Sequence, residues 1–170
     1  GLEMGIEAGN EEVRDHMKKK FTNEDINYFV TNLGERNITM KFLLIVGYPT
    51  ETEKMFEDTL QLIRDYAKYS HLISISHHVM MTFKNTPLDF EHRELFDSEF
   101  GFKWKNKNSD FDIRFQRFIK VYELGNELGY NFQQHCIDKI ERYKSDKLNE
   151  KRKSIGFAHP KAKKTLHVQS

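Results

Sequence analysis

The fold of this chain is decided by the run Phe42-Leu43-Leu44-Ile45-Val46-Gly47-Tyr48-Pro49-Thr50-Glu51-Thr52. Five consecutive apolar residues fit a parallel strand covered on both faces better than a half-exposed strand, in which apolar and polar residues would alternate. The Gly-Tyr-Pro-Thr sequence that follows is typical of a turn. A helix is expected next, because Phe56, Leu60 and Ile63 recur at intervals of three or four residues.

Strand and helix segments of the same kind lie on both sides of this run. Residues 2–7 read as a short strand, and another strand is expected over residues 72–81. Three residues are the expected N-caps of the intervening helices: Asn10, Thr22 and Thr52. Strands and helices that alternate with short connections predict right-handed βαβ units around a parallel sheet. Ile6, Ile45 and Ile75 should then belong to successive neighbouring strands.

Composition places the chain among soluble globular proteins. Of its 170 residues, 38% are hydrophobic and 31% are charged, and the formal net charge is +1. This balance argues against a dedicated nucleic-acid binder, which concentrates Lys and Arg to neutralise phosphates. No apolar stretch approaches the roughly 20 residues that span a bilayer. A single cysteine cannot form an internal disulfide, and no signal segment precedes the first strand, so we expect a cytoplasmic protein without membrane or specific nucleic-acid partners.

Two motifs resemble the second half of the core of radical S-adenosylmethionine (SAM) enzymes. The first is Gly5-Ile6-Glu7-Ala8-Gly9, followed by a helix that ends in Met17 and basic residues before Phe21. The second is Ile45-Val46-Gly47, followed by Pro49 and Glu51. The resemblance covers roughly the first 90 residues. It implies an α/β fold: a partial TIM-type (βα) barrel of parallel strands with its active site at their C-terminal ends, followed by a mainly helical C-terminal extension.

This resemblance divides the chain into three parts. Residues 1–90 are expected to form strands four to six of the partial barrel. Residues 91–145 begin with a segment rich in Phe and charged residues that has no sustained period, which we interpret as an irregular flap, and continue as helices. Residues 146–170 form a basic tail that we expect to be solvated and flexible.

The resemblance also assigns roles in a SAM site. Glu7 stands at the position from which family members contact the ribose, and a carboxylate can accept hydrogen bonds from both hydroxyls of the ribose diol. Lys19 stands at the position of a basic residue that pairs with the SAM carboxylate. Lys19 can equally be one of three lysines that offset the dipole at a helix C-terminus. The expected cofactor-binding residues are, in full, Glu7, Asn10, Lys19, Ile45, Val46, Gly47, His78 and Met80, of which those from Ile45 onward would lie along adenine.

The cluster-binding part of such an enzyme is missing from this sequence. Radical SAM enzymes hold a four-iron, four-sulfur cluster on a CxxxCxxC loop, whereas the single cysteine here is Cys136. We interpret Cys136 as a small buried hydrophobe. His77 and His78 point to opposite faces of a strand and cannot easily chelate one ion, so we predict no metal site. The chain alone should be inactive, whereas the complete protein would use SAM and the cluster, and also cobalamin if it belongs to the methyl-transferring relatives that carry a cobalamin domain.

Other functions remain open at this point. The chain could be a non-catalytic half-barrel that serves as a binding or assembly module. A weaker alternative is a fragment of an unrelated TIM barrel that binds phosphate, although the Gly-rich turns that such a site favours are not seen here. The expected partners are the missing N-terminal half of the barrel or a second copy of the chain, because residues 2–7 would otherwise form an open sheet edge.

Overall fold

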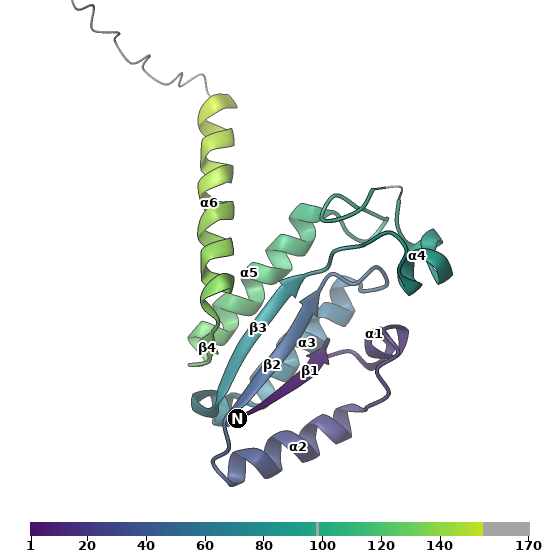
Figure 1. Ribbon diagram of the computed structural model, residues 1–170. Helices are drawn as coiled ribbons and strands as arrows, with labels where there is room; N and C mark the ends of the chain where they lie inside the picture. Colours follow the sequence, from purple (N-terminus) through teal and green to yellow (C-terminus); the bar gives the residue numbers. More distant parts are fainter. Residues whose placement is uncertain (98, 155–170) are drawn as a thin grey trace, which may run out of the picture. The chain divides into compact units, whose positions relative to one another are not determined.

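A computed structural model of the protein describes residues 1–97 and 99–154. The chain divides into two units at Cys136 and Ile137, and the first unit contains the whole sheet. Its four strands are β1 (Leu2–Glu7), β2 (Met40–Val46), β3 (Ile73–Val79) and β4 (Asn131–Phe132). They lie in the order β1-β2-β3-β4 and every pair is parallel (Figure 1). The predicted parallel sheet, with Ile6, Ile45 and Ile75 on successive strands, is therefore confirmed.

Helices and 3-10 turns connect these strands. They are α1 (Glu11–His16), α2 (Asn23–Glu35), α3 (Glu53–Asp65), η1 (Ala67–Leu72), α4 (Pro87–Glu91), η2 (Arg93–Leu95), α5 (Phe111–Glu127) and α6 (Gln134–Ser154). The three predicted N-caps are confirmed, since the side chains of Asn10, Thr22 and Thr52 accept hydrogen bonds from backbone N–H groups of the first turn. At Thr22 the backbone N–H donates in return to the Asp25 carboxylate, which completes a capping box.

Helices cover one face of the sheet. In β2, the residues Met40, Phe42, Leu44 and Val46 are buried, whereas the residues between them are partly exposed. Helix α5 packs against α3, β2 and β3 on the buried face (Figure 1), where His77 stacks on Phe118 with ring centroids 3.9 Å apart. The expectation that both faces of β2 are covered is wrong within the described residues. An apolar run is compatible with burial on one face or on both, and the packing partners decide between them.

The C-terminal half differs from the sequence expectation in four places. A short helix, α4, follows β3, and the two-residue strand β4 joins the sheet before α6. The helix expected from Asp112 is one continuous helix to Glu127, and it ends before Gly129, whose φ of 81° suits glycine. Helix α6 extends through the first part of the predicted basic tail to Ser154, and residues 155–170 of that tail lie outside the described residues. Among the described helices, none combines the length and apolarity needed to cross a bilayer.

Gly9 allows the β1–α1 turn to approach α3 closely. A Cβ atom on Gly9 would lie 2.3 Å from the carbonyl oxygen of Asp58 and 2.5 Å from the Cα of Thr59, both in the backbone of α3. The Gly9 N–H also donates to Thr59 Oγ1 at 2.9 Å. The change Gly9→Ala should therefore destabilise the protein by about 1–3 kcal/mol, because two backbone segments must separate.

Urea unfolding followed by circular dichroism measures this loss. Gly101→Ala is the control: a Cβ there meets no atom within 4 Å, and only the φ of 71° opposes it, which costs about 1 kcal/mol. Equal midpoints for Gly9→Ala and the wild-type protein would show that the turn does not contact α3 in this way.

Candidate functional site

A pocket of about 340 Å³ lies at the C-terminal ends of the long strands. Its lining comes from the loops after β1, β2 and β3 and from α4: His16, Met17, Lys18, Lys19, Ile45, Tyr48, Met80, Pro87, Leu88, Glu91 and His92. Beneath it, Tyr48 is buried in a cluster with Ala8 and Val13, against which Met17, Met80 and Leu88 pack. The pocket thus combines an apolar floor with charged side chains at its border.

The end of β1 brings a carboxylate to the open face of the sheet. The pairing with β2 shifts between Gly5 and Glu7, and Glu7 has a φ of 65°, which is rare for a residue with a side chain. The Glu7 carboxylate lies over Gly5, because a Cβ on Gly5 would be only 2.8 Å from Glu7 Oε1. Glu7 Oε1 is 2.9 Å from Lys19 Nζ, and the Glu7 side chain is 14% exposed. An acid in a strained conformation at a strand end is a feature that clusters at functional sites.

The turn after α1 places Lys19 opposite Glu7. Lys18 has a φ of 61°, and the N–H of Lys19 donates to the carbonyl of Arg14 at 2.9 Å. Arg14 itself is fully buried and donates from Nη1 to the carbonyls of Ala8 and Gly9 at 2.7 and 3.1 Å. Burial lowers the pKa of Arg14 from its usual value. The guanidinium therefore fixes the β1–α1 turn that follows Glu7, and the Arg14 carbonyl holds the backbone at Lys19.

A buried carboxylate holds the turn after β2. Glu51 Oε2 accepts from the N–H of Gly47 at 2.7 Å and from Arg117 Nη1 at 3.1 Å, and Arg117 Nε donates to Glu53 at 3.0 Å. Burial is the largest influence on Glu51, and it raises the pKa of this group to about 7. Gly47, with a φ of 82°, leaves the space that the Arg114 side chain fills. These contacts fix the turn that carries Tyr48 into the pocket.

The predicted site residues separate into two groups. Lys19, Ile45 and Met80 line the pocket, and Glu7 is joined to it through Lys19. The other four residues lie outside the pocket. Asn10 caps α1 and its side chain donates to Asp58 at 2.7 Å, and Val46 is in the core. Gly47 is in the turn beneath Arg114, and the exposed His78 stacks on His135. The contact between His78 and His135 is possible because β4 brings the start of α6 beside β3.

Sequence reasoning missed the wall formed by α4. Leu88, Glu91 and His92 lie in or directly after this helix, which begins after Thr86 with Pro87 at its first position. The Thr86 side chain accepts from the N–H of Asp89. A Thr three residues before an acid, with Pro between them, is a helix-start signal that could have revealed this wall.

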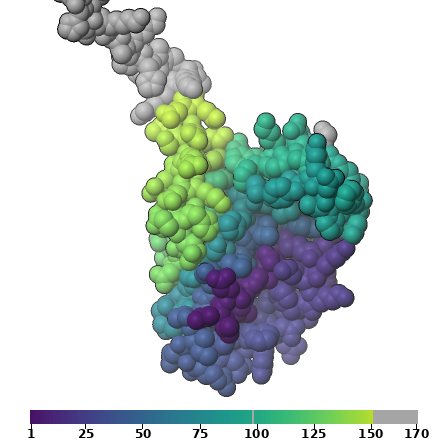
Figure 2. All heavy atoms as spheres, viewed as in Figure 1, coloured from purple at the N-terminus to yellow at the C-terminus, as the bar shows by residue number. Residues whose placement is uncertain are grey.

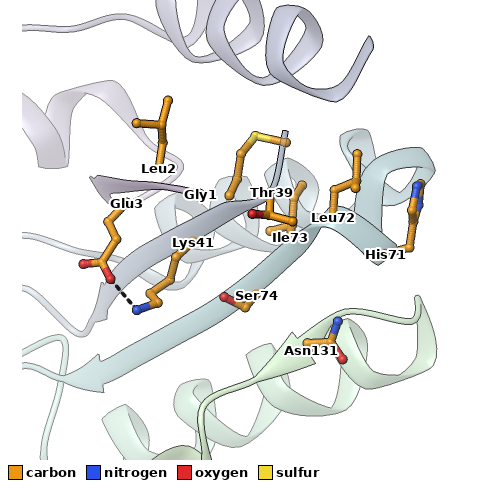
Figure 3. Close-up of a pocket in the computed structure, with 11 residues that line it drawn as sticks. Gly1, Leu2, Glu3, Thr39, Lys41, His71, Leu72, Ile73, Ser74 and Asn131 are labelled. Carbon is orange, nitrogen blue, oxygen red and sulfur yellow. Dashed lines mark hydrogen bonds and ion pairs between the residues drawn. The ribbon is translucent and has the colours of Figure 1, made fainter. Parts of the chain in front are cut away.

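A second pocket of about 360 Å³ lies at the opposite end of the strands. Figure 3 shows its lining from β1, β2 and β3, with Glu3 directed toward Lys41 in an ion pair. Ligands of parallel α/β sheets bind at the carboxyl ends of strands, and the other end usually serves stability. We therefore treat the pocket around Lys19, Ile45 and Met80 as the candidate site.

The described residues do not suit a metal or an iron–sulfur cluster. Across residues 1–97 and 99–154, no group of three or more His, Cys, Asp or Glu side chains could hold an ion. Cys136 is buried, as predicted, and its thiol donates to the carbonyl of His77 at 3.6 Å. One thiol cannot supply the several thiolates that a cluster requires.

The raised pKa of Glu51 predicts a pH-dependent stability. The folded state keeps the proton up to about pH 7, whereas the unfolded state releases it near 4.5. The contribution of protonated Glu51 to the free energy of unfolding is fully present below pH 4.5 and is lost as the pH rises through about 7. Its total is on the order of 3 kcal/mol. Glu51→Gln should abolish this loss, because an amide does not titrate.

Urea unfolding at a series of pH values tests this expectation. Glu53→Gln is the matched control, since Glu53 contacts the same Arg117 but its pKa is lowered, chiefly by a hydrogen bond from Lys120. The Glu53 variant should still lose stability between pH 4.5 and 7. If the Glu51 variant loses as much stability as the wild-type protein, Glu51 is already ionised in this range.

The chain is similar to part of several methylthiotransferases, although no protein-family model matches it. It is 37% identical over 62 residues to a tRNA-2-methylthio-N(6)-dimethylallyladenosine synthase of Clostridium novyi, covering 35% of this chain and 14% of that protein. It is 34% identical over 67 residues to the ribosomal protein uS12 methylthiotransferase RimO of Protochlamydia amoebophila, covering 38% of this chain and 14% of that protein. A tRNA-2-methylthio-N(6)-dimethylallyladenosine synthase of Alkaliphilus oremlandii is 25% identical over 137 residues, covering 79% of this chain and 25% of that protein.

The resemblance to the radical SAM superfamily is therefore supported, but its narrower placement is not. The relatives are methylthiotransferases, so neither the cobalamin-binding type nor a cobalamin cofactor has support. The chain spans only 14% to 25% of the length of these relatives. The relatives to which part of this chain is similar are methylthiotransferases, which belong to the radical SAM superfamily.

Proposed function

We propose that this chain forms one side of the SAM-binding site of a radical SAM methylthiotransferase. The observation that carries the proposal is the ion pair between Glu7 and Lys19, held at 2.9 Å beside an apolar pocket at the C-terminal ends of parallel strands. In this proposal β1, β2 and β3 are strands four to six of a TIM-type (βα) barrel. The similarity to methylthiotransferases supports the enzyme class.

The pocket has the chemical groups that SAM requires. Glu7 would accept hydrogen bonds from the ribose diol, and Lys19 would donate to the carboxylate of the methionine part. Ile45, Met80 and Tyr48 offer apolar surface for adenine. The volume of about 340 Å³ falls within the range of roughly 300–1,000 Å³ that is usual for small-molecule sites.

Each residue has a separate task in this scheme. SAM, reduced by a four-iron, four-sulfur cluster, is the source of a 5′-deoxyadenosyl radical in this superfamily. The two charged groups orient the ligand, because Glu7 and Lys19 are themselves fixed by the bulge of β1 and by the turn at Lys18. The apolar floor excludes water from adenine. Residues outside this chain must supply the cluster thiolates, and a reducing cytoplasm suits such a protein.

Loss of the ammonium group at position 19 should weaken SAM binding. Lys19→Ala is expected to raise the Kd for SAM by about tenfold, because a charged hydrogen bond is lost. Isothermal titration calorimetry with the purified chain measures this change. Lys20→Ala is the matched control, since Lys20 is exposed on the same segment and does not line the pocket.

The outcomes separate the two interpretations of Lys19. Equal Kd values for the Lys19 and Lys20 variants would show that Lys19 serves only the end of the helix. If the wild-type chain binds no SAM, this pocket is not a SAM site by itself, and the alternative of a non-catalytic binding or assembly module becomes the better interpretation.

We further propose that another strand covers the free edge of β1. Strand β1 pairs only with β2 among the described residues, and its first residues lie at the surface in Figure 2. Met4, Ile6, Phe21 and Phe29 border an apolar pocket of about 200 Å³ beside this edge. The missing N-terminal half of the barrel would cover it in the complete protein, and a second copy would do so when the chain is isolated.

Self-association of the isolated chain follows from this proposal. Two β1 edges related by a two-fold axis would pair antiparallel, and sedimentation equilibrium should show a dimer that dissociates on dilution. Leu2→Lys should weaken the dimer, because Leu2 is 51% exposed on this edge and an edge lysine opposes pairing. A folded chain that stays monomeric at all concentrations would exclude the dimer.

A further inference from the structure

In the segment from Glu99 to Asp110, which we call the flap, exposed and buried side chains alternate around Trp104. Lys103, Lys105 and Lys107 are exposed, whereas Trp104 between them is completely buried and Asn106 is partly buried. Sequence analysis predicted only an irregular segment here. The alternation means that every second side chain points toward the protein.

A buried guanidinium fixes the flap to α5. Arg114 Nη2 donates to the carbonyls of Phe102 and Trp104 at 2.8 and 2.9 Å, and the guanidinium carbon lies 3.8 Å from the centre of the Trp104 ring. Burial lowers the pKa of Arg114 to about 10, so the group stays charged at neutral pH. The flap therefore has a defined position relative to the strand ends.

Two flap side chains bind backbone carbonyls in or next to three of the four segments that surround the pocket. Trp104 Nε1 donates to the carbonyl of Met80 at 3.2 Å. Asn106 Nδ2 donates to the carbonyl of Pro49 at 2.8 Å and to that of Leu95 at 2.8 Å. Met80 lines the pocket, Pro49 follows the lining residue Tyr48, and Leu95 ends η2, which directly follows the lining residue His92.

We infer that Asn106 and Trp104 are positioning residues of the pocket, which hold three of its walls, those formed after β2, after β3 and by α4, at the spacing that the ligand requires. The inference rests on the proposed SAM site. Neither side chain lines the pocket, so both would act through Tyr48, Met80 and α4. Asn106 is suited to this task because its NH2 group has two donors and both are used, while its Oδ1 accepts from the N–H of Asn108.

The change Asn106→Asp tests the inference with almost no change of shape. A carboxylate has no donor, and it would place an oxygen against the carbonyls of Pro49 and Leu95. We expect the Kd for SAM to rise by about tenfold. Asn108→Asp is the matched control, because it makes the same change two residues away on the flap and should alter the Kd by less than about twofold.

Trp104 provides a direct measurement, because it is the single tryptophan of the chain. SAM binding should change its emission in the wild-type protein and in the Asn108 variant, and the titration yields the Kd independently of calorimetry. Circular dichroism and the thermal midpoint establish that each variant is folded at the temperature of the titration. An Asn106 variant that is less stable but binds SAM like the wild-type protein would overturn the inference.

Hydrogen exchange separates this inference from the proposed function. The N–H groups of Met80 and Glu51 are bonded to the carbonyls of Val46 and Tyr48 in the walls themselves. Without ligand, Asn106→Asp should accelerate their exchange by about tenfold relative to Asn108→Asp. If the wild-type chain binds no SAM but this acceleration occurs, the proposed function fails and the positioning of the walls stands. Unchanged exchange in the Asn106 variant would exclude the positioning role.

Discussion

Buried guanidinium groups hold the loops at the C-terminal ends of the long strands. Arg14, Arg114 and Arg117 are each at most 2% exposed. They donate to loop carbonyls at Ala8 and Gly9, at Phe102 and Trp104, and at Glu51, respectively. Carbonyls beyond the end of a strand have no ladder partner, and the five donors of a guanidinium can satisfy several of them together. The loops that surround the candidate pocket therefore depend on charges that lie beneath them.

This arrangement makes the pocket walls rigid and leaves its polar border adjustable. Burying arginine is costly, and here hydrogen bonds, aromatic contacts and an ion pair offset the cost. Arg14 lies over Phe21 and Arg114 over Trp104, whereas Arg117 pairs with the buried Glu51. The Lys19 side chain, by contrast, is 42% exposed, although it pairs with Glu7. A ligand can therefore compete for Lys19 without disturbing the walls.

In the proposed function the chain is one part of a larger catalytic unit, and its similarity to methylthiotransferases and its parallel sheet support this proposal. The chain spans at most 25% of the relatives described above, and its one cysteine is buried behind the sheet against the carbonyl of His77. In that proposal the groups that orient SAM lie in this chain, and the thiolates that hold a cluster come from outside it. The open edge of β1 is where such parts would meet in the proposed barrel.

The sequence by itself determined the parallel sheet and the N-caps at Asn10, Thr22 and Thr52, because these depend on local periodicity, capping chemistry and short turns. Lys19 was named only through the resemblance to radical SAM enzymes. Only the tertiary structure decided that helices cover one face of β2, that α4 forms a wall, and that Asn106 reaches Pro49. Contacts of this kind join residues far apart in the chain: the side chain of Arg117 meets Glu51 across 66 positions. No local pattern specifies such a contact, since it depends on how whole elements pack.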